Sequence, residues 1–382
     1  MGTSLQPLLR TPDQLIKTFS SFLPVVIFHL FMELSSQTTW VTVAIGLTLS
    51  LFLTLTMGAF WSKNQMPVDG KTVLITGASY GMGRSAARQM AERGANLILV
   101  SRSAGKLEEA LTEAKAAARN PQSQRFTYIL ADVSKPDYAP ALLAEAVKWN
   151  DGKPLDVVWC IAGTSTPDFW IEAPLSLTRK QMDINFWGAA EMAHAILRLW
   201  CAPNAPVVPE PKHLIFTSSV LAFFPVVGYG PYTPAKSALR GLADTLNQEL
   251  KLYPQDVKIH VVHPGSISSP GFERENLTKP DITLLIEEGD PVQTPDAVAA
   301  LAIKGLERGD YFITVAFLGH VLRWAAVGGS VRNNLVVDTI MSWIISFVML
   351  FALPDIFGKI RKYGKKNGHP INYRKKGNDD DE

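Results

Sequence analysis

The sequence is poor in cysteine and carries almost no net charge. Only Cys160 and Cys201 occur in 382 residues, which argues against a disulfide framework and fits a reducing compartment. The 37 Lys and Arg nearly balance the 35 Asp and Glu, for a formal charge of +2. A chain without a basic excess gives no reason to expect a nucleic-acid partner, and no metal site is predicted.

Charge is missing altogether from residues 34–62. Within this interval, Trp40 and Trp61 bracket about 22 mostly apolar residues, a length and a flanking pattern typical of a membrane-spanning helix. The stretch is too long and too far from the N-terminus for a cleaved signal peptide. We therefore expect residues 1–66 to be a membrane-anchoring region, in which the shorter apolar run 19–32 lies in the interface or pairs with its neighbour. A buried core helix is the alternative.

A glycine-rich turn follows the first strand-like run, residues 72–75, and precedes a helical pattern that ends near Gly94. Strand, glycine-rich turn and helix are the context that a dinucleotide fingerprint requires, because the turn brings a pyrophosphate to the helix N-terminus. An ordinary loop is the alternative. The turn residues predicted to bind the cofactor are Gly77, Ser79, Tyr80, Gly81 and Gly83.

The residues after the second and third strands indicate which dinucleotide is bound. NAD sites usually carry an acid after the second strand, whereas this chain has Arg102, with Lys106 one helical turn later and Arg84 as a further cation. Cations there favour NADP(H), although they could be ordinary surface charges. Asp132, which follows the third strand, could hydrogen-bond the adenine or cap the next turn.

Tyr232 and Lys236 lie four residues apart in a helical pattern that runs to about residue 252. Residues at this spacing share one helix face. The ammonium should therefore stabilise the phenolate and lower the phenol's pKa from about 10, which would provide a proton donor for an oxyanion. Because this spacing also arises by chance on solvated helices, its meaning depends on the other motifs.

Strands and helices alternate from the glycine-rich turn to about residue 308, which predicts an α/β fold with a Rossmann-type, doubly wound parallel sheet over residues 67–310. A loop over about 266–294 is expected to cover the substrate. One long helix is expected at 178–200. Since Asn is a poor helix former, Asn185 in its middle indicates a role for the amide.

These residues together resemble the short-chain dehydrogenase/reductase family, over about residues 70–271. The matching pieces, in family order, are Thr76-Gly77-x-x-x-Gly81-x-Gly83, Asn185, Ser219, Tyr232-x-x-x-Lys236 and Pro264-Gly265. One departure is Ile161, where the family usually has an Asn that supports the central sheet.

The resemblance implies roles for the matching residues. Tyr232 would be the general acid, and Lys236 would lower its pKa and hold the nicotinamide ribose. Ser219, rather than the neighbouring Ser218, would hydrogen-bond the substrate oxygen. Asn185 would complete a water-linked proton relay. The family also commonly forms homodimers.

The cofactor implied by the resemblance and by the cations is NADPH. Its predicted site comprises Gly77, Ser79, Tyr80, Gly81, Gly83, Arg102, Lys106, Asp132, Tyr232, Lys236 and Ile267.

Within the family, residues 223–229 and 269–272 look like those of the branch that reduces the long-chain sphingoid ketone 3-dehydrosphinganine to sphinganine, in sphingolipid synthesis on the cytosolic face of the endoplasmic reticulum. The acids that could bind the substrate ammonium are Glu273, Glu275, Glu287 and Glu288, although such loop acids are usually just solvated. The alternatives are a membrane-bound dehydrogenase for a steroid, retinoid or other lipid ketone, and a cofactor-binding scaffold without catalysis.

The C-terminal region contains two apolar runs and a charged tail. Residues 311–327 and 339–354 are each marginal as a membrane span, so we expect residues 311–357 to form a membrane-associated hairpin that turns at about 328–334. The tail, residues 358–382, is rich in Lys and Arg, which favours the cytosolic face and anionic lipid.

Overall fold

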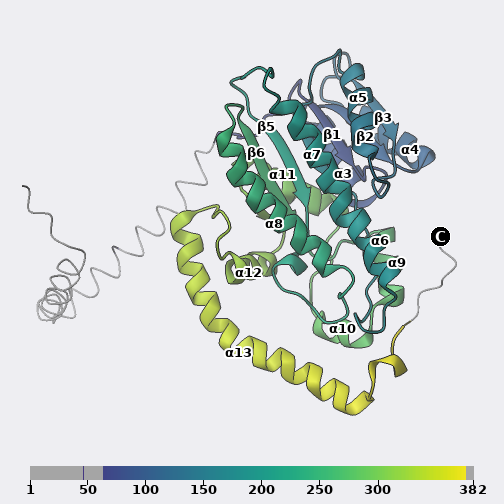
Figure 1. Ribbon diagram of the computed structural model, residues 1–382, viewed down its shortest axis with the longest axis vertical. Helices are drawn as coiled ribbons and strands as arrows, with labels where there is room; N and C mark the ends of the chain where they lie inside the picture. The colour runs from purple at the N-terminus through teal and green to yellow at the C-terminus, as the bar shows by residue number, and fades with distance from the viewer. Residues whose placement is uncertain (1–45, 47–62, 376–382) are drawn as a thin grey trace, which may run out of the picture. The chain divides into compact units, whose positions relative to one another are not determined.

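The computed structural model describes residue 46 and residues 63–375 (Figure 1). The predicted N-terminal membrane span and most of its anchoring region lie outside the described residues. The compact unit that contains the sheet begins at Asn64. Gln65 already donates its backbone N–H to the carbonyl of Glu307, and Met66 is buried in the core.

Seven parallel strands form one sheet in the order β3-β2-β1-β4-β5-β6-β7. The strands are β1 (Thr72–Thr76), β2 (Asn96–Ser101), β3 (Phe126–Leu130), β4 (Val157–Cys160), β5 (Lys212–Thr217), β6 (Val257–His263) and β7 (Phe312–Thr314). Every residue of β1 and β4 is buried, because helices cover both faces of the sheet. The strand order reverses between β1 and β4, where such folds bind their ligands.

Helices pack on the two faces of the sheet and extend from it (Figure 1). One core cluster joins the sheet to α3, α4 and α11, and the other joins it to α5, α7 and α8. The helices are α3 (Gly81–Ala91), α4 (Ala104–Ala116), α5 (Tyr138–Trp149), α6 (Leu175–Met182), α7 (Gly188–Trp200), α8 (Thr233–Glu249), α9 (Pro270–Thr278), α10 (Asp281–Ile286), α11 (Pro295–Arg308), α12 (Phe317–Ala326) and α13 (Leu335–Asn367). The predicted Rossmann-type parallel sheet is thus confirmed.

The helix predicted over 178–200 is not α-helical throughout, because a π-helical segment interrupts it. It consists of α6, a π-helical segment η1 (Asp183–Trp187) and α7. Single π-helical turns inside α-helices occur often at functional sites, and Asn185 lies within this one.

Of the two C-terminal apolar runs predicted to form a membrane-associated hairpin, the first, residues 311–327, has a different structure. Residues 312–314 form β7 in the sheet, because an edge strand covered by helices reads as an apolar run just as a membrane segment does. Only Phe317–Ala326 of that run is helical, as α12. The second run is part of α13, which is 33 residues long and, within the described chain, is the one helix long and apolar enough to cross a membrane.

Both ends of α13 are attached to the sheet-containing unit. Near its start, Asp338 forms a buried ion pair with Arg323 of α12 at 2.7 Å. Beyond its end, the 3-10 turn η4 (Pro370–Asn372) leads to Arg374, which forms an ion pair with the buried Asp168 at 2.6 Å. Figure 1 shows α13 running from beside α12 to the region of α10.

Candidate active site

One cavity of about 1780 Å³ lies at the carboxyl ends of the strands, bounded by α9, α10 and α13. This volume exceeds the ~300–1,000 Å³ of a typical small-molecule site, so the cavity can hold a dinucleotide and a second ligand. The predicted catalytic and cofactor-binding residues that line it are Gly77, Ser79, Tyr80, Gly81, Gly83, Arg102, Asp132, Ser219, Tyr232, Lys236 and Ile267. Of the acids predicted for the substrate ammonium, Glu275, Glu287 and Glu288 line it and Glu273 does not. Asn185 and Lys106 are not among the lining residues.

Tyr232 and Lys236 meet at the start of α8, as their spacing predicted. Tyr232 is the residue immediately before the helix, and Pro234 occupies its first turn, where a missing N–H breaks no helical hydrogen bond. The ammonium of Lys236 lies 5.7 Å from the centre of the Tyr232 ring. Its Nζ donates a hydrogen bond to the carbonyl of Thr217, at the end of β5, at 3.0 Å.

The predicted lowering of the phenol's pKa is wrong for this structure. Burial raises the pKa of Tyr232 above its usual value, the Glu275 carboxylate raises it further, and a hydrogen bond with Ser219 lowers it only in part. Burial also lowers the pKa of Lys236 to about 8, so the charged ammonium still predominates at neutral pH. The phenol therefore keeps its proton at neutral pH, as a general acid must.

The two adjacent serines have different partners. Ser218 is 2% exposed, and its hydroxyl donates to the backbone carbonyl of Lys236 at 2.8 Å. The Ser219 hydroxyl accepts from the backbone N–H of Leu221 at 3.2 Å, and it lies close enough to Tyr232 to lower the phenol's pKa. The geometry therefore favours Ser219 as the residue that contacts a substrate oxygen, and gives Ser218 the task of holding α8 against β5.

Asn185 lies behind the cavity wall. Its amide oxygen accepts from the N–H of Thr164 at 3.0 Å, and its amide nitrogen donates to the carbonyls of Thr164 and Gln181 at 2.9 and 3.0 Å. A Cβ at Gly163 would lie 2.9 Å from the Asn185 oxygen and 3.2 Å from Lys236 Nζ. Asn185 thus positions the backbone beside Lys236, and this geometry neither requires nor contradicts the predicted proton relay.

The glycine-rich turn is built for close backbone approach. Gly77 has a φ of +71°, and a Cβ there would come within 2.7 Å of the Ala162 backbone. A Cβ at Gly83 would lie 2.1 Å from the Gly77 carbonyl oxygen. No acidic residue occupies the first turn of α3, and no side chain caps its start. This uncapped helix N-terminus at the cavity suits a pyrophosphate.

The cations predicted to select the cofactor fall into two groups. Arg102 is exposed and lines the cavity, and Lys106 lies 5.8 Å from the centre of the Tyr80 ring. Arg84 instead points to α4, where it forms ion pairs with Glu109 at 3.0 Å and Glu113 at 2.7 Å. The guanidinium of Arg84 is therefore already paired with carboxylates of the protein, and its suggested role at the cofactor is not supported.

The remaining predicted residues shape the walls. Asp132 accepts from the N–H and the hydroxyl of Ser134 at 3.0 and 2.7 Å, so it caps the turn after β3 while it also lines the cavity. Ile161 packs against the core in place of the family's Asn. There the Thr76 hydroxyl accepts from the N–H groups of Ile161 and Ala162 at 3.2 and 3.3 Å, which ties β1 to β4.

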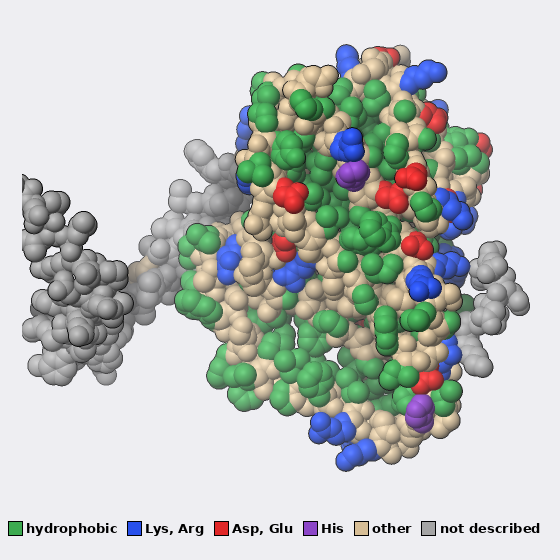
Figure 2. All heavy atoms as spheres, viewed as in Figure 1, with side chains coloured by type: hydrophobic (Ala, Val, Ile, Leu, Met, Phe, Trp, Pro, Cys, Tyr) green, Lys and Arg blue, Asp and Glu red, His purple; other side chains and the backbone are tan. Residues whose placement is uncertain are grey.

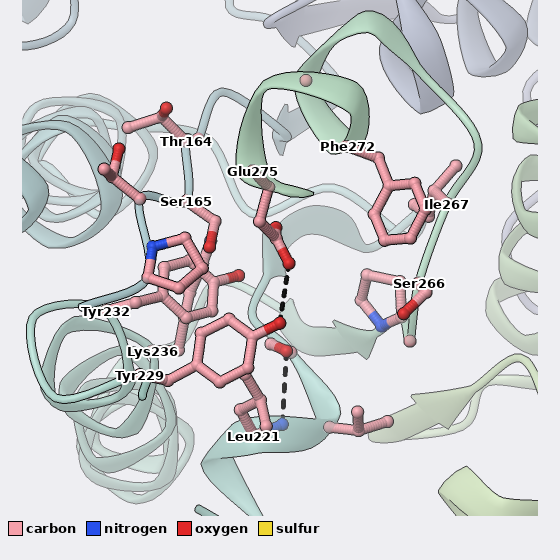
Figure 3. Close-up of a pocket in the computed structure, with 18 of the residues that line it drawn as sticks. Thr164, Ser165, Leu221, Tyr229, Tyr232, Lys236, Ser266, Ile267, Phe272 and Glu275 are labelled. Atoms are coloured by element: carbon pink, nitrogen blue, oxygen red, sulfur yellow. Dashed lines mark hydrogen bonds between the residues drawn. The ribbon is translucent and has the colours of Figure 1, made fainter. Parts of the chain in front are cut away.

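Two features of the cavity were missed by the sequence analysis. Tyr229 lies beside Tyr232 and donates its hydroxyl to Glu275 at 2.7 Å (Figure 3). Asp168 and Arg374, 206 positions apart, bring the C-terminal segment to the cavity rim. The spacing of Tyr229 and Tyr232, three residues apart, could have suggested that both tyrosines face the cavity. No local sequence signal links Asp168 to Arg374.

Residues 71–280 match the family model for short chain dehydrogenases. The chain belongs to this family. The predicted resemblance is thereby confirmed, and the protein is an oxidoreductase of a fold that binds NAD or NADP.

Curated relatives within the short-chain dehydrogenase family extend the match beyond the sheet. The chain is 54% identical to the 3-ketodihydrosphingosine reductase gsl-3 of Neurospora crassa, over 89% of this chain and 95% of the relative. It is 44% identical to the 3-ketodihydrosphingosine reductase ksrA of Aspergillus fumigatus, over 87% of this chain and 96% of the relative. These names agree with the substrate predicted from the sequence.

Solved structures share the fold at lower identity. A short-chain dehydrogenase from Sphingobium yanoikuyae in complex with NADPH superposes with a TM-score of 0.56 at 20% identity, over 68% of this chain and 92% of that one. This likeness concerns the fold alone.

The buried Lys236 leads to a prediction about stability and pH. An unfolded lysine keeps its proton to about pH 10.4, whereas folded Lys236 has a pKa of about 8. Between these values the unfolded state binds more protons, so rising pH favours the folded state. Relative to a Lys236→Met variant, the parent's free energy of unfolding should rise by about 3 kcal/mol between pH 7 and 10.5, measured by urea unfolding without cofactor.

The comparison with Lys236→Met cancels the titrations that both proteins share. Lys251→Met, which removes an exposed lysine, controls for the loss of one charge. The same pH dependence in the parent and Lys236→Met would contradict the lowered pKa.

Proposed function

We propose that this protein reduces 3-ketodihydrosphingosine, also called 3-dehydrosphinganine, to sphinganine with NADPH. The observation that carries the proposal is the convergence of Ser219, Tyr232 and Lys236 in one cavity large enough for a dinucleotide and a lipid. The two reductases that share 54% and 44% identity over most of the chain support this substrate.

The residues are arranged for the reduction of a ketone. NADPH, when bound, supplies the hydride to the carbonyl carbon, and negative charge then develops on the oxygen. Ser219 donates a hydrogen bond to that oxygen, and Tyr232 protonates it. Lys236, held by the Thr217 carbonyl, lies where it can contact the nicotinamide ribose. Its ammonium can stabilise the phenolate that forms when Tyr232 gives up its proton.

The cofactor choice rests on Arg102 and Lys106. No acid takes the place of Arg102 after β2, and an Arg at this position accommodates a 2′-phosphate. Arg102 lines the cavity, and Lys106, which does not line it, lies four residues later in the first turn of α4. A phosphate between two cations would form charge-assisted hydrogen bonds that a ribose hydroxyl cannot.

Membrane association of α13 fits a lipid substrate. Several large apolar side chains on α13 are more than half exposed, namely Trp343, Phe347, Leu350, Phe351 and Phe357, and Figure 2 shows hydrophobic side chains gathered along this helix. Because Arg323–Asp338 and Asp168–Arg374 hold both ends on the same folded unit, we place α13 along the membrane surface rather than across it. Its inner face, including Met349 and Ala352, lines the cavity.

The location on the cytosolic face of the endoplasmic reticulum and the homodimer stay predictions of the sequence analysis.

Tyr232→Phe should keep NADPH binding and lose turnover. Removal of the hydroxyl takes away the proton donor but little of the packing, so kcat for 3-ketodihydrosphingosine should fall by at least ~10²–10⁴-fold. NADPH oxidation in detergent and fluorescence titration of NADPH measure the two properties. Phe186→Leu, at an aromatic residue outside the cavity lining, is the control. Undiminished turnover by Tyr232→Phe would refute the mechanism.

Arg102→Gln combined with Lys106→Gln should weaken NADPH binding about 10- to 100-fold and change NADH binding little, because only NADPH carries the 2′-phosphate. Fluorescence titration with each cofactor measures this ratio. Arg84→Gln is the matched control, since its guanidinium is bound by Glu109 and Glu113. An equal loss for NADPH and NADH would argue against a 2′-phosphate site.

Phe347→Ser combined with Phe351→Ser should reduce membrane binding by α13. Each exposed ring contributes ~2 kcal/mol when it enters an apolar phase, so the vesicle-bound fraction in a flotation assay should fall more than tenfold. Protein lacking residues 1–62 isolates the contribution of α13. Val207→Ser with Leu252→Ser, at exposed positions outside α13, is the control. Equal flotation of both double variants would contradict the proposal.

A further inference from the structure

A buried ammonium is already bound by carboxylates in the catalytic cavity. Lys279, at the end of α9, is 1% exposed, and its Nζ lies 3.0 Å from Glu275 Oε1 and 2.8 Å from Glu287 Oε2. The two carboxylates are 16% and 15% exposed and line the cavity. Tyr229 donates to the same Glu275 oxygen at 2.7 Å. This wall of the cavity therefore has the chemistry that recognises an ammonium group.

The cluster has a spare negative charge. Glu275 and Glu287 both contact the one ammonium, and Asp290 lies close enough to interact with Glu287 and Lys279, so the cluster has more carboxyl groups than cations. Within the described residues, the contacts of Glu275 with Tyr229 and Lys279 both use Oε1, which leaves Oε2 for a further donor. A carboxylate in a partly dry cavity is costly unless it is paired, so a cationic ligand would be favoured here.

The spare charge lies next to the catalytic phenol. The Tyr229 and Tyr232 rings are 6.0 Å apart, and Glu275 is close enough to raise the pKa of Tyr232. Figure 3 shows Tyr229, Tyr232 and Glu275 pointing into the same part of the cavity. A ligand whose carbonyl oxygen meets Tyr232 would thus place an adjacent substituent beside Glu275.

We propose that Glu275 binds the ammonium group on the carbon next to the reacting ketone, and so makes this cavity selective for 2-amino ketones. The inference rests on the proposed function and goes beyond it, because it assigns a specificity-determining residue. Lys279 and Tyr229 position the carboxylate, since both hold its other oxygen. The alternative is a purely structural ion pair that closes α9 onto α10.

The relative activity of the protein on two substrates distinguishes a Glu275 that binds the substrate ammonium from a Glu275 that is purely structural. The substrates are 3-ketodihydrosphingosine and a long-chain 1-hydroxy-3-ketone of the same length that has hydrogen in place of the amino group. The ratio of their kcat/KM values should favour the amino ketone in the parent. In Glu275→Gln this ratio should fall about 10- to 100-fold, mainly through KM for the amino ketone. Because both substrates are assayed on one protein sample, partial unfolding cancels from the ratio.

Two further variants sharpen the test. Glu273→Gln removes an exposed carboxylate from the same helix and should keep the parent ratio. Glu275→Asp retains the charge at a shorter reach and should give an intermediate ratio. An unchanged ratio in Glu275→Gln, with both substrates slowed equally, would overturn the proposal and leave Glu275 a structural residue. Failure of the parent to reduce either ketone would instead refute the proposed function.

Discussion

The hydrogen bond from the buried Lys236 ammonium to the Thr217 carbonyl is the contact on which the proposed catalytic arrangement depends. Burial disfavours the charged form of Lys236. The ammonium is therefore held only where a backbone oxygen accepts its hydrogen bond and the surrounding atoms pack closely against it. Gly163 leaves the space for Nζ, and Asn185 in the π-helical turn holds that backbone in place. The ends of β4 and β5 and the start of α8 are thereby fixed relative to one another. Because Tyr232 immediately precedes α8, this arrangement also fixes the position of its phenol.

The cavity divides into two parts with different chemistry. The part formed by the strand ends and the glycine-rich turn carries the groups that the short-chain dehydrogenase family shares. The part formed by α9, α10 and α13 combines a charged cluster around Lys279 with apolar side chains. A ligand with a polar, cationic head and a long apolar tail matches this division, because the charged cluster lies beside Tyr232 whereas α13 lines the wall towards the exposed apolar surface.

The electrostatics of the site illustrate the limit of reasoning from spacing. The four-residue interval correctly brought Tyr232 and Lys236 together, since helix geometry is local. It failed to give the direction of the phenol's pKa, because that depends on burial and on Glu275, which lies 43 positions from Tyr232 in the sequence. The same limit applies to Arg84, whose partners on α4 were invisible until the helices were packed.

The sequence by itself determined the alternation of strands and helices, the glycine-rich turn and the pairing of Tyr232 with Lys236 at the start of one helix, because each depends on local periodicity or on a short motif. Only the tertiary structure decided that residues 312–314 join the sheet, that Glu275 faces Tyr232 and that Arg374 reaches Asp168. Apolar runs read alike in a sheet and in a membrane, and the partner of a charged side chain is set by packing between distant segments. The environment of an apolar run and the partner of a charged side chain therefore depend on the folded chain, and a short stretch of sequence does not specify them.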